Sequence, residues 1–166
     1  TNVTITDNTA VFGGGMGLWN SNSILTHVTI SNNTAGYAGG GMRLESSSPT
    51  FTNVTISNNT ADIGGGMFLL ESSPTLTDVT ISNNTGSGGG MYLYYADPTL
   101  INVTITDNTA NWGGGMHLVA SSPTLTDVTI TDNTAGWGGG GMCINNSNPT
   151  LTNVIINNNT ADSKGG

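Results

Sequence analysis

Hydrophobic residues in this chain alternate with freely varying ones in two kinds of short segment. Each glycine run is followed by methionine, a variable residue and a leucine or isoleucine, as in residues 91–93 (MYL). Elsewhere, valine and isoleucine flank one polar residue, as in residues 79–81 (VTI). Alternation with a period of two is typical of a β-strand that buries one face. Because Leu76 lies three residues before Val79, we expect the chain to bend between them.

Both segments recur along the whole chain at a step of about 25 residues, which indicates a tandem repeat. The unit consensus reads GGGM-x-L-x-x-SS-P-T-L-T-[ND]-V-T-I-[ST]-[ND]-N-T-A, and about 6.6 copies of it fill the sequence. The methionines all take the same place in the unit, and we expect them to form one internal column: Met16, Met42, Met67, Met91, Met116 and Met142.

One unit cannot bury its apolar face alone, whereas stacked units cover one another. The repeat therefore predicts an all-β parallel β-helix, a solenoid with about 25 residues and three short strands in each of about 6.6 coils. Successive coils would be about 4.8 Å apart, the distance between paired strands. We expect the glycine run at a corner that needs positive φ or close contact between coils.

One asparagine occurs in every unit, three residues after the isoleucine. Such a residue can adopt the left-handed conformation at a bend. Stacked asparagine side chains can also form hydrogen bonds from coil to coil, which buried amides require. We expect a structural ladder of Asn8, Asn33, Asn59, Asn84, Asn108, Asn133 and Asn159.

Charge excludes one large class of partners. The net charge is −8, and Arg43 and Lys164 are the two fixed cations of the sequence. So few cations cannot neutralise a row of phosphates, which excludes nucleic-acid binding. No apolar run approaches the roughly 18 residues of a transmembrane helix. Cys143 is the one cysteine, so it has no partner for an internal disulfide.

The glycine and asparagine motifs carry a family resemblance. GGGM in each unit, together with residues 81–84 (ISNN) and their equivalents, resembles the repeat pair of the polymorphic outer-membrane proteins and related autotransporter passengers. The resemblance covers the whole chain and implies a right-handed parallel β-helix. It also implies a secreted or surface-displayed protein, often adhesive, from a bacterium or archaeon.

The repeat is expected to form a single solenoid segment over residues 1–166. The sequence opens in the middle of a coil and stops where the next methionine is due. Uncapped coils expose unpaired strand edges. We therefore expect part of a longer array or filament, in which copies of the chain associate end to end or side by side.

The variable positions beside the methionine strands are rich in large apolar residues that should point outward. A contiguous exposed apolar stripe is typical of an interaction surface. Partner copies of the chain, or a surface polysaccharide stacked on the rings, would both fit. The predicted surface comprises Trp19, Phe68, Leu70, Tyr92, Tyr94 and Tyr95.

Metal and cofactor chemistry has little support in the sequence. Asp107 is expected to stack on Asp132, with Asp127 at the other end of the same strand, and such carboxylates are a weak candidate for a structural Ca²⁺ site. Their alternative role is as polar corner residues. His27 and His117 lie more than three coils apart, so we expect no shared metal between them. No other cofactor is expected.

We interpret the chain as a non-enzymatic, extracellular structural or adhesive solenoid. A carbohydrate-binding surface is the first alternative. A polysaccharide-processing enzyme would depend on Arg43 and Glu45, which no second acid joins in the same columns of the next coil. An ice-binding solenoid would depend on the outward threonine and serine positions, such as Thr80 and Ser82, whose alternative role is as ordinary solvent-facing strand residues.

Overall fold

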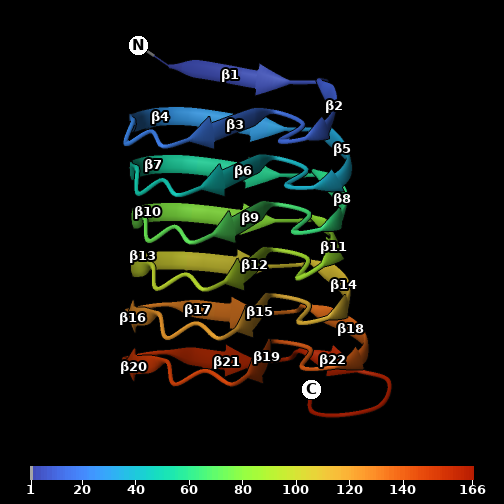
Figure 1. The fold of residues 1–166 in the computed structure, drawn as a ribbon. Helices are drawn as coiled ribbons and strands as arrows, with labels where there is room; N and C mark the ends of the chain where they lie inside the picture. Colours follow the sequence, from blue (N-terminus) through green and yellow to red (C-terminus); the bar gives the residue numbers. More distant parts are fainter. Residues whose placement is uncertain (1) are drawn as a thin grey trace.

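Short parallel strands wound into stacked coils form almost the whole molecule (Figure 1). The computed structural model describes residues 2–166; Thr1, the first residue of the predicted segment, lies outside the described residues. Each complete coil adds one level to three parallel sheets, here named A, B and C. Nothing in residues 2–166 forms a helix long and apolar enough to cross a membrane.

The strands divide among the sheets as follows. Sheet A contains β1 (Val3–Thr6), β4 (Ile24–Ser31), β7 (Thr50–Ser57), β10 (Thr75–Ser82), β13 (Thr99–Thr106), β16 (Thr124–Thr126), β17 (Thr129–Thr131), β20 (Thr150–Thr152) and β21 (Ile155–Asn157). Sheet B contains β2 (Thr9–Phe12), β5 (Thr34–Ala38), β8 (Thr60–Ile63), β11 (Thr85–Ser87), β14 (Thr109–Trp112), β18 (Thr134–Gly138) and β22 (Thr160–Ala161). Sheet C contains β3 (Met16–Trp19), β6 (Met42–Glu45), β9 (Met67–Leu70), β12 (Met91–Tyr94), β15 (Met116–Val119) and β19 (Met142–Asn145).

Equivalent residues of successive coils pair with each other. In sheet C, Met91 pairs with Met67 on one side and Met116 on the other. In sheet A, Val79 pairs with Val54 and Val103 in the same way. This register confirms the predicted all-β parallel solenoid, with three strands per coil and about 25 residues between equivalent positions.

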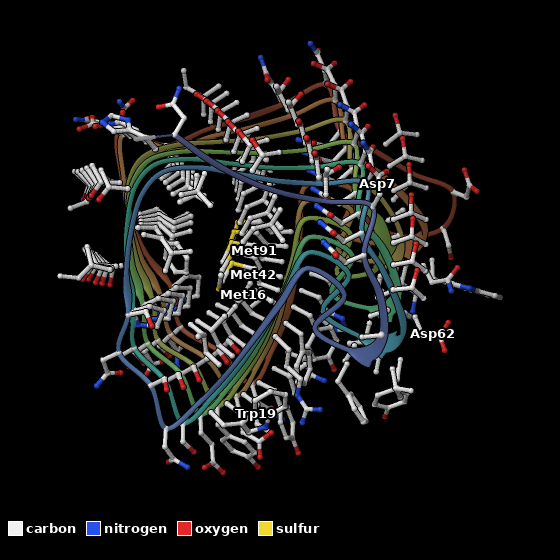
Figure 2. The ribbon with its side chains drawn as sticks, turned by 90° about the horizontal axis from the view of Figure 1, so that it is seen from above. Asp7, Met16, Trp19, Met42, Asp62 and Met91 are labelled. Carbon is white, nitrogen blue, oxygen red and sulfur yellow. The ribbon has the colours of Figure 1, made fainter. Side chains whose placement is uncertain are left out.

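The inward residues of the three sheets form one continuous core. Met91 and Leu93 from sheet C meet Leu76 and Ile81 from sheet A, and all four are fully buried. In Figure 2 the sulfur atoms of Met16, Met42 and Met91 lie in one file inside the coil. Met16 lies in the first coil and is only partly buried. Burial of one face by stacking is the arrangement that the alternation predicted.

A hydrogen-bonded column of asparagines lines the corner between sheets A and B. The backbone amide and the Nδ2 of Asn84 both donate to Oδ1 of Asn108, at 2.9 and 3.0 Å. The same Nδ2 also donates to the carbonyl oxygen of Ile56 at 3.1 Å. Asn59 donates to Asn84 in the same manner. The column therefore satisfies buried amides that would otherwise be costly.

At the corner between sheets A and B, the left-handed conformation belongs to a different residue than the sequence predicted. The ladder asparagines do not have positive φ; the residue before each of them does, as at Asn83 (φ 56°). Within sheet A, Asp78 (φ 55°) makes the bend predicted between Leu76 and Val79. A third such column follows sheet C and includes Tyr95 (φ 51°). Asn and Asp tolerate this conformation best, which explains why they dominate the first two columns.

The glycine corner joins sheet B to sheet C and requires glycine for two reasons. Gly88 has φ +63°, where a side chain is strained. A Cβ on Gly89 would lie 2.6 Å from the carbonyl oxygen of Gly114 in the next coil. The two coils thus approach more closely here than any side chain would permit.

Variation in coil length is confined to sheet B. Seven positions separate Asn84 from Met91, whereas nine separate Asn33 from Met42. The register shifts of the structure all lie in this sheet, for example where β11 pairs with β8. Gly86, with φ +157°, occupies the short coil, and a Cβ there would meet the carbonyl oxygen of Ala61 at 2.5 Å. Sheets A and C keep strict register as a result.

Candidate functional site

The outer face of sheet C, hereafter the sheet C face, carries two columns of large side chains. Its strands turn methionine and leucine inward, so the residues between and after them point away from the core. Trp19 visibly projects outward in Figure 2. The first column contains Arg43, Phe68, Tyr92, His117 and Cys143, and the second contains Trp19, Glu45, Leu70, Tyr94 and Val119.

The first column is half-buried because its rings pack on one another. Phe68 and Tyr92 are stacked with ring centroids 5.6 Å apart, and Tyr92 meets His117 edge to face at 4.8 Å. The glycine corner lies directly beside them, since a Cβ on Gly88 would be 2.9 Å from Cβ of Tyr92. Burial raises the pKa of Tyr92, with a smaller contribution from Tyr94. These residues therefore stabilise the fold as well as lining the face.

On the sheet C face, the exposed rings belong to the second column and to the corner that follows it; sheet B carries exposed rings of its own at Tyr37 and Trp137. Trp19 is 50% exposed, Tyr94 37% and Tyr95 58%. The rings of Tyr94 and Tyr95 meet edge to face with centroids 4.6 Å apart. Leu70 is half-buried beside Tyr94. The predicted surface residues thus share one side of the solenoid, with the exposed rings at Trp19, Tyr94 and Tyr95.

Arg43 is held inside an aromatic cluster. Its guanidinium carbon lies 4.3 Å from the ring centroid of Phe12, and Nη2 donates to Oε2 of Glu45 at 2.7 Å. Trp19 Nε1 donates to the same carboxylate oxygen at 3.0 Å. The side chain of Arg43 is 14% exposed. The pair that the sequence offered as an enzyme candidate is therefore engaged in cation–π and ion-pair contacts with its neighbours.

His117, Cys143 and Trp112 line one surface hollow of 330 Å³, together with Ile144 and Asn145. His117 and Cys143 are register partners on β15 and β19. Burial lowers the pKa of His117 and raises the pKa of the Cys143 thiol. Nδ1 of His117 is buried and has no hydrogen-bond partner. Both residues occupy the variable place directly after methionine in the repeat, whereas the hollow also depends on Trp112 from sheet B.

The three aspartates of the weak calcium candidate do not form one cluster. Asp127 lies at the bend inside sheet A, where Nδ2 of Asn153 donates to its Oδ1 at 3.1 Å. Asp132 lies at the corner toward sheet B and accepts from Thr131 Oγ1 at 3.0 Å. Asp107, one coil away, accepts from Thr106 Oγ1 in the same way. Within residues 2–166, no three His, Cys, Asp or Glu side chains are grouped so as to hold a metal ion.

The threonine positions of the ice-binding alternative lie on the outer face of sheet A. Thr80 pairs with Thr55 and Thr104, and Ser82 pairs with Ser57 and Thr106. Thr106 uses its hydroxyl to bond Asp107. The two columns therefore mix solvent-facing hydroxyls with hydroxyls that donate to the side chains of aspartates at the left-handed bends.

Sequence reasoning missed a second internal hydrogen-bonded column, made by the first serine of the SS pair. The amide of Ser47 donates to Oγ of Ser72 at 3.0 Å, and Oγ of Ser72 donates to the carbonyl oxygen of Leu70 at 2.7 Å. Ser121 and Ser147 repeat this pattern. The recurrence of serine before proline was the available signal, although a polar turn explains it equally well.

Comparison with known protein families gave one match. A family model described as "Right handed beta helix region" matches residues 1–135, a stretch that ends within β18. No curated protein matches the chain. The matched stretch includes the strands that bear Trp19, Phe68, Tyr92 and His117.

Proposed function

Because the chain belongs to the right-handed β-helix family, we propose that it works as an extracellular structural or adhesive rod. In this proposal the sheet C face is the contact surface and a second copy of the chain is its partner. The observation that carries the proposal is that the otherwise half-buried sheet C face bears exposed rings, Tyr94 and Tyr95 in contact with each other and Trp19 three coils away.

Stacking supports the structural part of the proposal. Every coil is tied to the next by backbone pairing in three sheets and by the asparagine side chains. Such a solenoid bends little, because each coil contacts its neighbours over its whole circumference. The chain then functions as a stiff rod. We propose a non-catalytic role, in which Arg43 and Glu45 stabilise the packing of the side chains around them.

Charge supports self-association through this face in particular. The chain has ten acidic residues and a net charge of −8, so copies repel each other in most orientations. From the strands of sheet C only Glu45 projects as an acid, and Arg43 pairs with it. The strands of two sheet C faces can therefore approach without an unpaired like charge between them; the exposed carboxylate of Glu71 lies outside the strands, in the corner column that also bears Tyr95. Aromatic residues are enriched at such interfaces because they bury much area.

The resemblance of the glycine and asparagine motifs to surface-displayed bacterial passengers supports an extracellular location. The low charge content, 7% of residues, and the polar uncharged coat fit a secreted repeat array. Detection of the protein in the medium or on intact cells of its source, by protease shaving and mass spectrometry, would test the location. Recovery from the cytoplasm alone would contradict it.

Association is tested by sedimentation velocity over a range of concentrations, with negative-stain imaging of the same samples. The variant is Tyr94→Ser combined with Tyr95→Asn. Asparagine suits the left-handed backbone at position 95, so this variant should fold at least as well as the parent. Losing two aromatic anchors should weaken association by about tenfold or more.

A matched control replaces two exposed threonines of sheet B, Thr60→Ser and Thr109→Ser, and should associate as the parent does. A parent that stays monomeric at every concentration, or a tyrosine variant that associates equally well, would sink the proposal.

A carbohydrate-binding surface is the second candidate for the same face. The exposed rings of Trp19 and Tyr95 favour it, since sugars stack on such rings. Affinity electrophoresis in gels containing soluble polysaccharides separates the two functions. Retardation of the monomer that disappears in the Tyr94→Ser, Tyr95→Asn variant would assign the face to carbohydrate.

A further inference from the structure

We propose that His117 and Cys143 bind a soft monovalent metal cation, such as Cu(I), at the hollow beside Trp112. The two residues are neighbours in the first column of the sheet C face and line the same hollow. This site lies on the same sheet C face but does not include the exposed rings on which the proposed association depends.

The spacing of the two side chains suits one bridging ion. They project from register-paired positions of adjacent parallel strands, which are about 4.8 Å apart. A cation bonded to one imidazole nitrogen at about 2.0 Å and one sulfur at about 2.3 Å spans a similar length when its coordination is linear. The register thus places the two residues one strand spacing apart, a separation that a two-coordinate ion can bridge.

The donor set selects the class of metal. Thiolate sulfur favours soft ions such as Cu(I), and imidazole also binds copper. Zinc in proteins almost always takes four ligands, and calcium takes six or more oxygens. The hollow is lined by Trp112, His117, Cys143, Ile144 and Asn145 and offers no carboxylate. A thiolate from Cys143 and a neutral imidazole from His117 together carry one negative charge, which a monovalent cation balances.

His117 has an unmet requirement that a bound cation would satisfy. Its Nδ1 is buried and lacks a hydrogen-bond partner, which is unfavourable in a folded protein. A neutral imidazole carries a lone pair on the ring nitrogen that bears no proton. On binding, the Cys143 thiol releases its proton to solvent as the sulfur–metal bond forms, and the imidazole lone pair completes the coordination.

The test uses Ag(I), a redox-inert ion of the same class, in buffer with free methionine to compete for weak thioether binding. The chain has two histidines, so the imidazole signals in a ¹H–¹⁵N NMR spectrum report on His117 and His27 separately. We expect one equivalent of Ag(I) to shift the His117 signals and to leave those of His27 in place.

Three variants complete the experiment. Cys143→Ser should lower Ag(I) affinity by about 100-fold or more, and His117→Phe, which preserves the ring against Tyr92, by about tenfold or more. His27→Asn is the matched control and should bind as the parent does. Thermal unfolding by circular dichroism verifies that each variant is folded. Unshifted His117 signals, or equal affinity in His117→Phe, would show that Cys143 acts as a lone thiol and would overturn the proposal.

Discussion

A single alanine interrupts the serine column beside the core. Ala96 is fully buried at the place where the neighbouring coils have serine. Ala96 has no hydroxyl, so it cannot accept a hydrogen bond from the backbone amide of Ser72 in the way that Oγ of Ser72 accepts one from the amide of Ser47. Ala96→Ser should raise the free energy of unfolding by about 1 kcal/mol, the usual net value of one hydrogen bond. Urea denaturation measures this, with Ala120→Ser as a control at a left-handed corner; a less stable Ala96→Ser chain would contradict the expectation.

His117 should make stability depend on pH. Burial lowers its pKa in the folded state, so below about pH 6.5, the ordinary histidine value, the unfolded chain takes up a proton that the folded chain refuses. Stability is then lost as pH falls, until the folded histidine is also protonated. Tyr92 on β12 and Cys143 on β19 are the titratable neighbours that face it in the column.

The comparison of parent and His117→Phe isolates this effect from the carboxylates. The melting temperature of the parent should fall more than that of His117→Phe between pH 7.5 and 5. Equal falls in both proteins would exclude a contribution from His117.

At the scale of the element, the asparagine column should contribute strongly to stability. Asn84→Ala removes the acceptor of the Asn59 amide and side chain and the donor to the Ile56 carbonyl, all of them buried. Leaving several buried groups unpaired should cost about 3 kcal/mol or more. Asn83→Asp, an exchange already present in other coils, should cost little by comparison. Guanidinium denaturation measures the free energy of unfolding of both variants. Similar losses of stability in the two would contradict a stabilising role of the column.

The strands were predictable because alternation and repeat length determine them, and Met91 and Val79 lie where the pattern requires. The left-handed column before each ladder asparagine was not, since neighbouring residues such as Asn83 and Asn84 are chemically alike and only the backbone distinguishes them. The half-burial of Phe68 and Tyr92 was also missed, because it depends on the glycine corner folding back beside sheet C. Contacts between equivalent residues of successive coils could be predicted from the repeat. Contacts between residues of different sheets could not.

At the scale of the whole molecule, each coil depends on the coils on both sides. Met91 is fully buried between Met67 and Met116, whereas Met16 has one neighbouring coil and is partly exposed. Met91→Ala should therefore cost about 2–5 kcal/mol in the 166-residue chain, and Met16→Ala clearly less. Urea denaturation of the two variants measures the difference. Equal losses would mean that the coils do not stabilise one another through nearest neighbours.

Because the coils differ in length only within sheet B, this sheet is the place where the fold should tolerate an inserted peptide. A peptide spliced in after Gly36, in one of the longest coils, would loop outward while sheets A and C keep their phase. Even one residue inserted between Val79 and Ile81 would turn every following side chain of that strand to the opposite face. Grafted epitopes or reporter tags should therefore be inserted in sheet B. Individual repeats can also gain or lose residues there without disturbing the hydrophobic core.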